Sequence, residues 1–155
     1  MFKLGNVVRT LCCIACLSFV SLYSMASGDA LPAVVDLSDA DVTIHGICSG
    51  DKSGCCVFGA GDVNGDGIED FIIGAYLGDP GGDSQAGESY IVYGSTSDIG
   101  TSGALYLEEL NGGNGVRLDG IDAWDYSGWN VAGTGDIDGD GYVDVLVGAL
   151  GEILE

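Results

Sequence analysis

Two stretches of the chain are nearly the same: Asp62-Val63-Asn64-Gly65-Asp66-Gly67-Ile68-Glu69-Asp70 and Asp136-Ile137-Asp138-Gly139-Asp140-Gly141-Tyr142-Val143-Asp144. Each places carboxylate or amide side chains at the first, third, fifth and ninth positions of a glycine-containing loop. Calcium is a hard cation that takes about six to eight oxygen ligands, and alternate positions of a curled loop can all point at one ion. The sequence therefore predicts two calcium-binding loops with one ion each.

Each predicted site combines four side chains with one backbone carbonyl. The predicted ligands are Asp62, Asn64, Asp66, the carbonyl of Ile68 and Asp70 in the first loop, and Asp136, Asp138, Asp140, the carbonyl of Tyr142 and Asp144 in the second. An EF-hand loop begins in this way but ends with a bidentate glutamate at its twelfth position. That position is Ile73 or Val147 here, so a β-hairpin loop closed by aspartate fits better. The alternative is an ordinary Asn/Asp/Gly hairpin turn that needs no metal.

The similarity between the two halves of the chain extends beyond the loops, whose first residues are 74 positions apart. The same offset aligns glycines and small residues on both sides: Gly46 with Gly120, Ser53-Gly54 with Ser127-Gly128, Gly59 with Gly133, and Gly74-Ala75 with Gly148-Ala149. Glycines kept at equal offsets imply that both copies make the same turns. A repeat of this length is typical of propellers, solenoids or arrays.

The pattern within one repeat predicts strands alone. We expect strands over residues 54–60, 70–76 and 89–94, a turn over 78–87, and a fourth strand over either 104–110 or 116–118. The run over 70–76 is almost continuously apolar, which indicates a strand buried on both faces. Four short strands per repeat are typical of a propeller blade. The predicted fold is therefore all-β, a partial β-propeller of about one and a half blades, with a first repeat over 31–110 and a truncated second repeat over 111–155.

The N-terminal segment differs from the rest of the chain. Lys3 and Arg9 precede an apolar run over residues 11–23 that ends in small residues, the pattern of a secretory signal peptide. We expect a signal over residues 1–26, with cleavage after Ala26 or as late as residue 30. The run is shorter than the roughly 20 residues that span a membrane, and an uncleaved anchor is the alternative. The signal therefore predicts a secreted, extracellular or cell-envelope protein.

The chain carries 24 acidic residues, and only Lys52 and Arg117 oppose them beyond the predicted signal. Nucleic acid and anionic membrane surfaces both require a basic face, so the charge excludes them as partners. Bound divalent cations would offset much of the repulsion among the acids.

Three of the six cysteines lie outside the predicted signal: Cys48, Cys55 and Cys56. An oxidising compartment would permit one disulfide, from Cys48 to either Cys55 or Cys56, with one thiol left over. Burial as small hydrophobic side chains is the alternative. A structural zinc site wants about four ligands, and only His45 is near these cysteines, which argues against zinc.

The block from Ser127 to Asp136, continued to Gly148-Ala149, resembles the FG-GAP repeat of integrin α-subunit propellers and their bacterial relatives. Residues 114–120 resemble the lead-in of tandem bacterial versions, and the resemblance runs from about Asp36 to the end. It implies that each repeat forms a blade, that the loop joins two strands and holds calcium, and that the assembled propeller binds other macromolecules. The family's closing Gly-Ala-Pro reads Gly74-Ala75-Tyr76 and Gly148-Ala149-Leu150 here.

These features predict a secreted or surface calcium-binding propeller segment for adhesion or recognition of an extracellular protein or glycan, in which calcium is structural. We expect no enzyme, since the single histidine, His45, has no convincing catalytic partner. The alternative is a non-catalytic appendage or fragment of a larger secreted hydrolase or multi-repeat protein, completed by blades from the same or another chain. The aromatic residues Trp124, Tyr126 and Trp129 predict either a ligand-stacking surface or blade packing.

Overall fold

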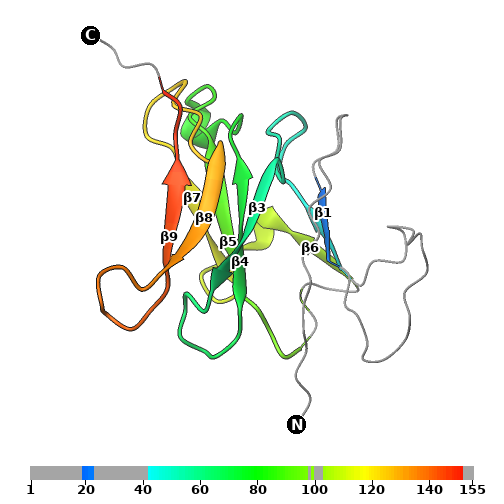
Figure 1. The fold of residues 1–155 in the computed structure, drawn as a ribbon. Helices are drawn as coiled ribbons and strands as arrows, with labels where there is room; N and C mark the ends of the chain where they lie inside the picture. The colour runs from blue at the N-terminus through cyan, green and yellow to red at the C-terminus, as the bar shows by residue number, and fades with distance from the viewer. Residues whose placement is uncertain (1–18, 23–41, 98, 100–102, 152–155) are drawn as a thin grey trace, which may run out of the picture.

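The computed structural model describes residues 19–22, 42–97, 99 and 103–151, and these contain β-strands, two short 3-10 helices and no α-helix (Figure 1). The strands are β1 (Phe19–Leu22), β2 (Val42–His45), β3 (Cys56–Gly61), β4 (Asp70–Ala75), β5 (Glu88–Val92), β6 (Ala104–Tyr106), β7 (Gly115–Asp119), β8 (Asn130–Gly135) and β9 (Asp144–Gly148). The 3-10 helices are η2 (Pro80–Gly82) and η3 (Leu107–Glu109). The prediction of an all-β fold is confirmed. Of the predicted signal peptide, only β1 falls within the described residues.

One complete blade forms the centre of the molecule. Its strands run antiparallel in the order β3-β4-β5-β7, which is the meander expected of a propeller blade. Of the two candidates for the fourth strand, the structure selects 116–118, which lies in β7. The candidate over 104–110 was wrong as a blade strand, because β6 instead pairs in parallel with β2 and is followed by η3.

Strand β4 is buried at all six of its positions, as its apolar run predicts. Its alternate side chains enter two different cores. Ile73 packs with Tyr90 on the side that β2 and β6 cover, whereas Ile72 packs with Ala60 and Val131 on the side of the second repeat. Full burial of an aliphatic side chain contributes about 1.5–3 kcal/mol, so this strand stabilises the blade against both of its neighbours.

The second repeat has the geometry of the first. Strand β8 pairs with β9 antiparallel, and every paired residue lies 74 positions after its counterpart in β3 and β4. The bulge between Gly59 and Gly61 recurs between Gly133 and Gly135. The described chain is therefore a partial β-propeller, with one four-stranded blade and the first two strands of the next.

The two blades approach each other closely through glycines. A Cβ atom on Gly133 would overlap the backbone of Gly59 and Ala60, and a Cβ on Gly74 would overlap the carbonyl of Gly128. Side chains at these positions would push the sheets apart. Glycine here is required by packing between blades.

The structure forms no disulfide from Cys48. Cys48 is an exposed free thiol, whereas the free thiol of Cys56 lies against β8 and donates to the side-chain oxygen of Asn130 at 3.3 Å. The hypothesis of a bridge from Cys48 to Cys55 or Cys56 is therefore wrong for this structure. The thiol of Cys55 donates to the carbonyl of Gly74 at 3.8 Å, and that of Cys56 faces β8, whereas Cys48 is exposed. Cys56 is half-buried in the core between the blades.

Candidate metal centre

The two acidic loops connect equivalent strands and project from the same end of the molecule (Figure 1). The first joins β3 to β4 and the second joins β8 to β9. Because the bulge in each hairpin is the same, the loops leave their sheets in the same way.

The side chain of Asp136 organises the second loop. Its Oδ1 accepts the backbone N–H groups of Gly139 at 2.7 Å and Asp140 at 3.1 Å, and its Oδ2 accepts that of Gly141 at 3.0 Å. Gly139 and Gly141 have φ values of 81° and 95°, which favour glycine. The backbone of the loop therefore wraps around the carboxylate of Asp136.

Asp62 organises the first loop in the same manner. Its Oδ1 accepts the N–H groups of Gly65 at 2.8 Å and Asp66 at 3.0 Å, and its Oδ2 accepts that of Gly67 at 2.8 Å. The equal bonding of the two loops shows that their common sequence specifies a common backbone.

In the second loop, three predicted ligands come together. Carboxylate oxygens of Asp136, Asp138 and Asp144 all lie within 4.8 Å of one another. Calcium binds oxygen at about 2.3–2.6 Å, so two oxygens on opposite sides of one ion are separated by about 5 Å. This donor set, made of hard oxygen ligands alone, fits calcium. Without a cation, two carboxylates about 4 Å apart would repel each other by roughly 4 kcal/mol at an effective dielectric constant of 20.

The fifth-position aspartate turns toward its own loop in both copies. Asp140 Oδ1 accepts the backbone N–H of Tyr142 at 2.9 Å, and Asp66 Oδ1 accepts that of Ile68 at 2.8 Å. These bonds place Tyr142 and Ile68, whose carbonyls are the predicted backbone ligands, in the closing turn of each loop.

The first loop differs from the second at two predicted ligands. The amide of Asn64 donates to Asp66 Oδ2 at 3.0 Å. Asp70 accepts the backbone N–H of Val63 at 2.9 Å, as Asp144 accepts that of Ile137 at 2.7 Å. Asp70 differs in that it is buried and also accepts the backbone N–H of Gly94 at 2.8 Å. Burial raises the pKa of Asp70, whereas the hydrogen bonds from Gly94 and Val63 lower it. Asp70 thus ties this loop to the end of β5.

The two loops also contact each other. The ring of Tyr142 lies over Gly65, where a Cβ atom would be 3.2 Å from Tyr142 Cδ1, and the methyl groups of Val143 would be 3.0 Å from a Cβ on Gly61. A side chain at either glycine would separate the loops. The candidate metal sites therefore share a boundary between neighbouring blades.

Comparison with known proteins gives the family. The sequence model of the FG-GAP repeat matches residues 57–92 and 127–153, and each match contains one acidic loop. The chain belongs to the FG-GAP, integrin-α-like family. It is 30% identical to integrin alpha-2 of Mus musculus over 104 residues, which are 67% of this chain and 8% of that protein.

Two further integrins are similar to this FG-GAP chain. Integrin alpha pat-2 of Caenorhabditis briggsae is 30% identical over 132 residues, covering 77% of the chain and 9% of that protein. Integrin alpha-6 of Gallus gallus is 34% identical over 101 residues, covering 64% of the chain and 8% of that protein. The chain thus spans less than a tenth of the length of these relatives. None of the helices in its described part is long and apolar enough to cross a membrane.

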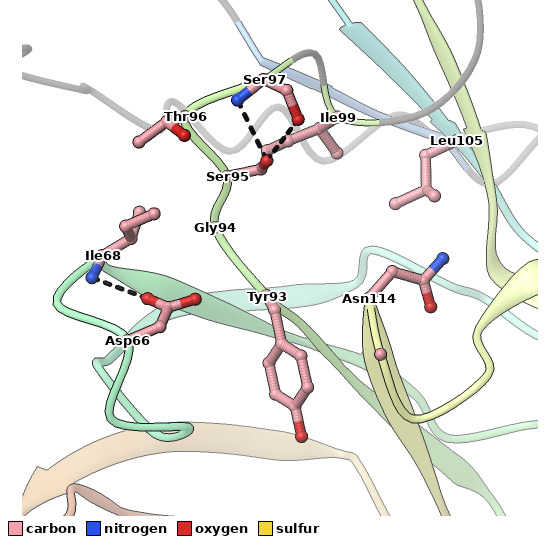
Figure 2. A pocket seen from close by; sticks show the side chains of 11 residues that line it. Asp66, Ile68, Tyr93, Gly94, Ser95, Thr96, Ser97, Ile99, Leu105 and Asn114 are labelled. Carbon is pink, nitrogen blue, oxygen red and sulfur yellow. Dashed lines mark hydrogen bonds between the residues drawn. The ribbon is translucent and has the colours of Figure 1, made fainter.

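A cavity of about 420 Å³ lies beside the first FG-GAP loop (Figure 2). Asp66 and Ile68 from the loop, the segment 93–97 after β5, and Asn114 before β7 contribute to its lining. The sequence did not predict this cavity, because its lining comes from separate segments of ordinary composition. Its size is within the range of small-molecule sites, about 300–1,000 Å³.

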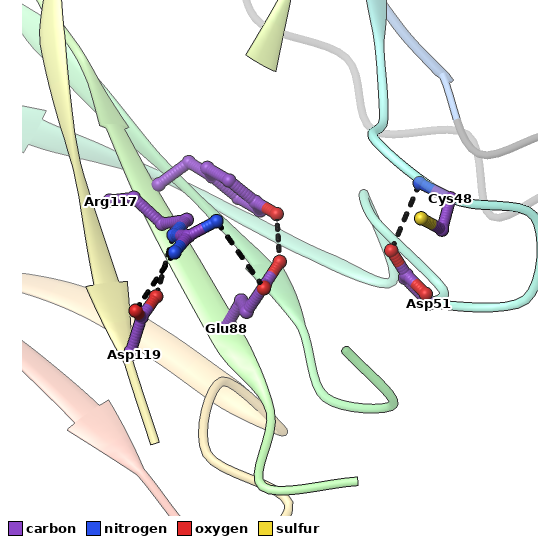
Figure 3. A network of polar contacts seen from close by, with 6 residues as sticks. Cys48, Asp51, Glu88, Arg117 and Asp119 are labelled. Atoms are coloured by element: carbon purple, nitrogen blue, oxygen red, sulfur yellow. Dashed lines mark hydrogen bonds and ion pairs between the residues drawn. The ribbon is translucent and has the colours of Figure 1, made fainter. Parts of the chain in front are cut away.

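A polar network joins the buried side chains of Glu88 and Tyr90 in β5 to the exposed Arg117 and Asp119 in β7 (Figure 3). The hydroxyl of Tyr90 donates to Glu88 Oε2, and Arg117 lies 3.7 Å from Glu88 Oε1 and 2.6 Å from Asp119 Oδ1. Burial raises the pKa of Glu88, and burial together with the bond to Glu88 raises that of Tyr90. Sequence reasoning missed this network, whose residues belong to two strands that are distant in the chain.

Proposed function

We propose that this chain is part of a secreted or surface-displayed β-propeller that binds calcium and serves adhesion or macromolecular recognition. The observation that carries the proposal is the convergence of Asp136, Asp138 and Asp144 within 4.8 Å, on a loop whose backbone bonding recurs in the first repeat. Calcium is structural in this proposal. It neutralises the clustered acids and fixes the hairpin, with one ion in each loop.

The partner is an extracellular protein or glycan, bound by the assembled propeller. Integrin α chains are the relatives that the chain matches, and the formal net charge of −20 disfavours nucleic acid and anionic membranes. The chain is not an enzyme in this proposal. Its histidine, His45, stacks on Tyr106 with ring centroids 4.7 Å apart, which gives it a packing role in β2.

The exposed face of β8 and β9 supports a requirement for further blades. Leu146 is 61% exposed, whereas its counterpart in the first repeat, Ile72, is fully buried beneath the second repeat. Another blade, from the same or another chain, would cover Leu146 as the second repeat covers Ile72.

The test is a melting curve of the purified chain in calcium and in chelator, with calorimetric titration of calcium. Binding that occurs only in the folded state adds folding stability. At a free calcium concentration 100 times the dissociation constant, the gain is about 2.7 kcal/mol per site. We expect a clear rise in melting temperature and heat of binding for two ions.

The matched variants are Asp136→Asn and Asp83→Asn, since Asp83 is an exposed acid outside both loops. The Asp136→Asn variant should lose one bound ion and much of the calcium-dependent stabilisation. Asp83→Asn should behave as wild type. Equal melting curves in calcium and in chelator, with no heat of binding at millimolar calcium, would refute a structural calcium role.

A further inference from the structure

Four aromatic side chains form a continuous cluster at the end of the blades opposite the acidic loops. The ring centroids of Tyr76 and Trp129 are 4.5 Å apart, those of Tyr76 and Tyr126 are 6.3 Å apart, and those of Tyr126 and Trp124 are 6.5 Å apart. Trp124 is 50% exposed and Trp129 is 48% exposed. The two tryptophans, at the ends of the cluster, therefore present large ring surfaces to solvent.

Two of these residues have a strained backbone. The φ angles of Trp124 and Tyr126 are 72° and 54°, in the left-handed region where a bulky residue is an outlier. The first repeat places Gly50, with φ of 111°, and Lys52, with φ of 60°, at the equivalent positions. The fold therefore requires the left-handed turn, but it does not require aromatic rings there. Strain of this kind concentrates at functional sites.

The turn that carries the rings is bonded to the neighbouring turn of the first blade. The backbone N–H of Trp124 donates to the carbonyl of Ser84 at 2.9 Å, and that of Tyr126 donates to the carbonyl of Gln85 at 3.1 Å. These bonds fix the backbone beneath the rings. A ligand that lies on them would meet a surface that is already ordered, which reduces the entropic cost of binding.

The two turns beside the rings carry acidic residues and no basic ones. Residues 77–87 and 118–151 contain no lysine, arginine or histidine, while Asp79, Asp83, Asp122 and Asp125 lie in the two turns. The side chain of Asp79 accepts the backbone N–H of Gln85 at 2.6 Å, and that of Asp125 accepts the N–H of Asp122 at 3.3 Å. The field of these four carboxylates thus favours a cation, although two of them already accept hydrogen bonds from the backbone.

We propose that the cluster of Tyr76, Trp124, Tyr126 and Trp129 binds a quaternary ammonium group of the choline class. Ring faces attract a cation through the ring quadrupole. A quaternary ammonium donates no hydrogen bonds, so its chemistry matches ring surface in a negative field. This inference rests on the proposed recognition function and specifies the chemistry of one ligand.

The chain provides its own probe, because Trp124 and Trp129 are its two tryptophans. Choline chloride titrated into the intact, calcium-loaded chain should change the tryptophan fluorescence saturably in the millimolar range. The neutral isostere 3,3-dimethyl-1-butanol should bind at least about tenfold more weakly, and sodium chloride controls for ionic strength. Equal binding of choline and the isostere, or no saturable change, would overturn the proposal.

The matched variants carry the residues of the first repeat. Trp124→Gly and Tyr126→Lys introduce the amino acids that the fold already accepts at positions 50 and 52. Each should weaken choline binding at least about tenfold and keep the calcium-dependent melting shift. The exposed Phe58 lies outside the cluster, so Phe58→Leu should bind choline as wild type does. Unchanged choline binding in Trp124→Gly would also overturn the proposal.

Two further arms define the ligand. Vesicles of phosphatidylcholine that bind while free choline does not would overturn the proposal, because the ammonium group would not be what is recognised. A trilysine peptide that binds more tightly than choline would overturn it too, since hydrogen-bonding ammonium groups would then be preferred. Loss of the calcium-dependent melting shift with choline binding intact would refute only the calcium role.

Discussion

Asn64 and Asp138 occupy the third position of the two loops and are the only predicted side-chain ligands whose residue type differs between them. The structure gives them different surroundings. Asp138 belongs to the cluster of carboxylates, whereas Asn64 donates its amide to Asp66. Because calcium affinity rises with the number of charged ligands, the second loop should bind calcium more tightly than the first.

Exchanging these residues tests this order. We expect Asp138→Asn to weaken the tighter site about tenfold, which corresponds to about 1.4 kcal/mol, and Asn64→Asp to strengthen the weaker site by a similar factor. Calorimetric titration of both variants and the wild type gives the two affinities. Weaker binding in Asn64→Asp would show that the bond from Asn64 to Asp66 matters more than charge.

At this scale the sequence was informative wherever the chemistry was local. The alternation of acids and glycines in residues 136–144 is enough to predict a curled loop, and the structure brings Asp136, Asp138 and Asp144 together. The bond from Gly94 to Asp70 could not be predicted, because it joins the loop to a segment 24 residues away. The contribution of Tyr76 to the aromatic cluster was missed for the same reason.

At the scale of elements, β5 carries a buried acid, Glu88, that the sequence did not reveal. Burial raises the pKa of Glu88 above its ordinary value of 4.5, so the folded state holds the proton more tightly than the unfolded state does. The stability linked to this group is complete below that ordinary value. It is lost as pH rises through the raised pKa of the folded state.

The variant Glu88→Gln removes this titration while keeping an acceptor for the hydroxyl of Tyr90. Below pH 4.5, variant and wild type should be similar in stability, and the variant should gain relative to the wild type as pH rises. Urea unfolding of both proteins, from below pH 4.5 upward, measures the difference in their free energies of unfolding. The acids of the two loops titrate in both proteins, so their contribution cancels in this difference. If the variant instead loses stability relative to the wild type as pH rises, the ion pair of Glu88 with Arg117 outweighs the cost of burying the charge.

The elements themselves were predictable to different degrees. Strand β4 has a continuous apolar run, and only burial on both faces accommodates it. The choice between residues 104–110 and 116–118 was not decidable from pattern, because both are short and mix apolar with charged residues. Strand pairing decides the choice. Val116 and Leu118 pair with Ile91 and Ser89 of β5, whereas β6 pairs with β2.

At the scale of the whole molecule, the repeat offset predicted the arrangement of the blades. Residues 74 positions apart occupy the same places in their sheets. What the offset could not show is which faces are covered in this chain. Equivalent residues have the same register but different neighbours, so their burial differs.

Leu146 and Ile72 are a matched pair for the final prediction. Ile72→Ser should destabilise the chain by about 3 kcal/mol, because it removes a fully buried aliphatic side chain between the blades. Leu146→Ser should change stability by no more than about 0.5 kcal/mol, as expected for an exposed position. Urea unfolding of the two variants measures both costs. Adding the next repeat to the chain should raise the cost of Leu146→Ser toward that of Ile72→Ser, since a third blade would bury Leu146. If the cost stays small in that longer protein, the next blade does not pack on this face.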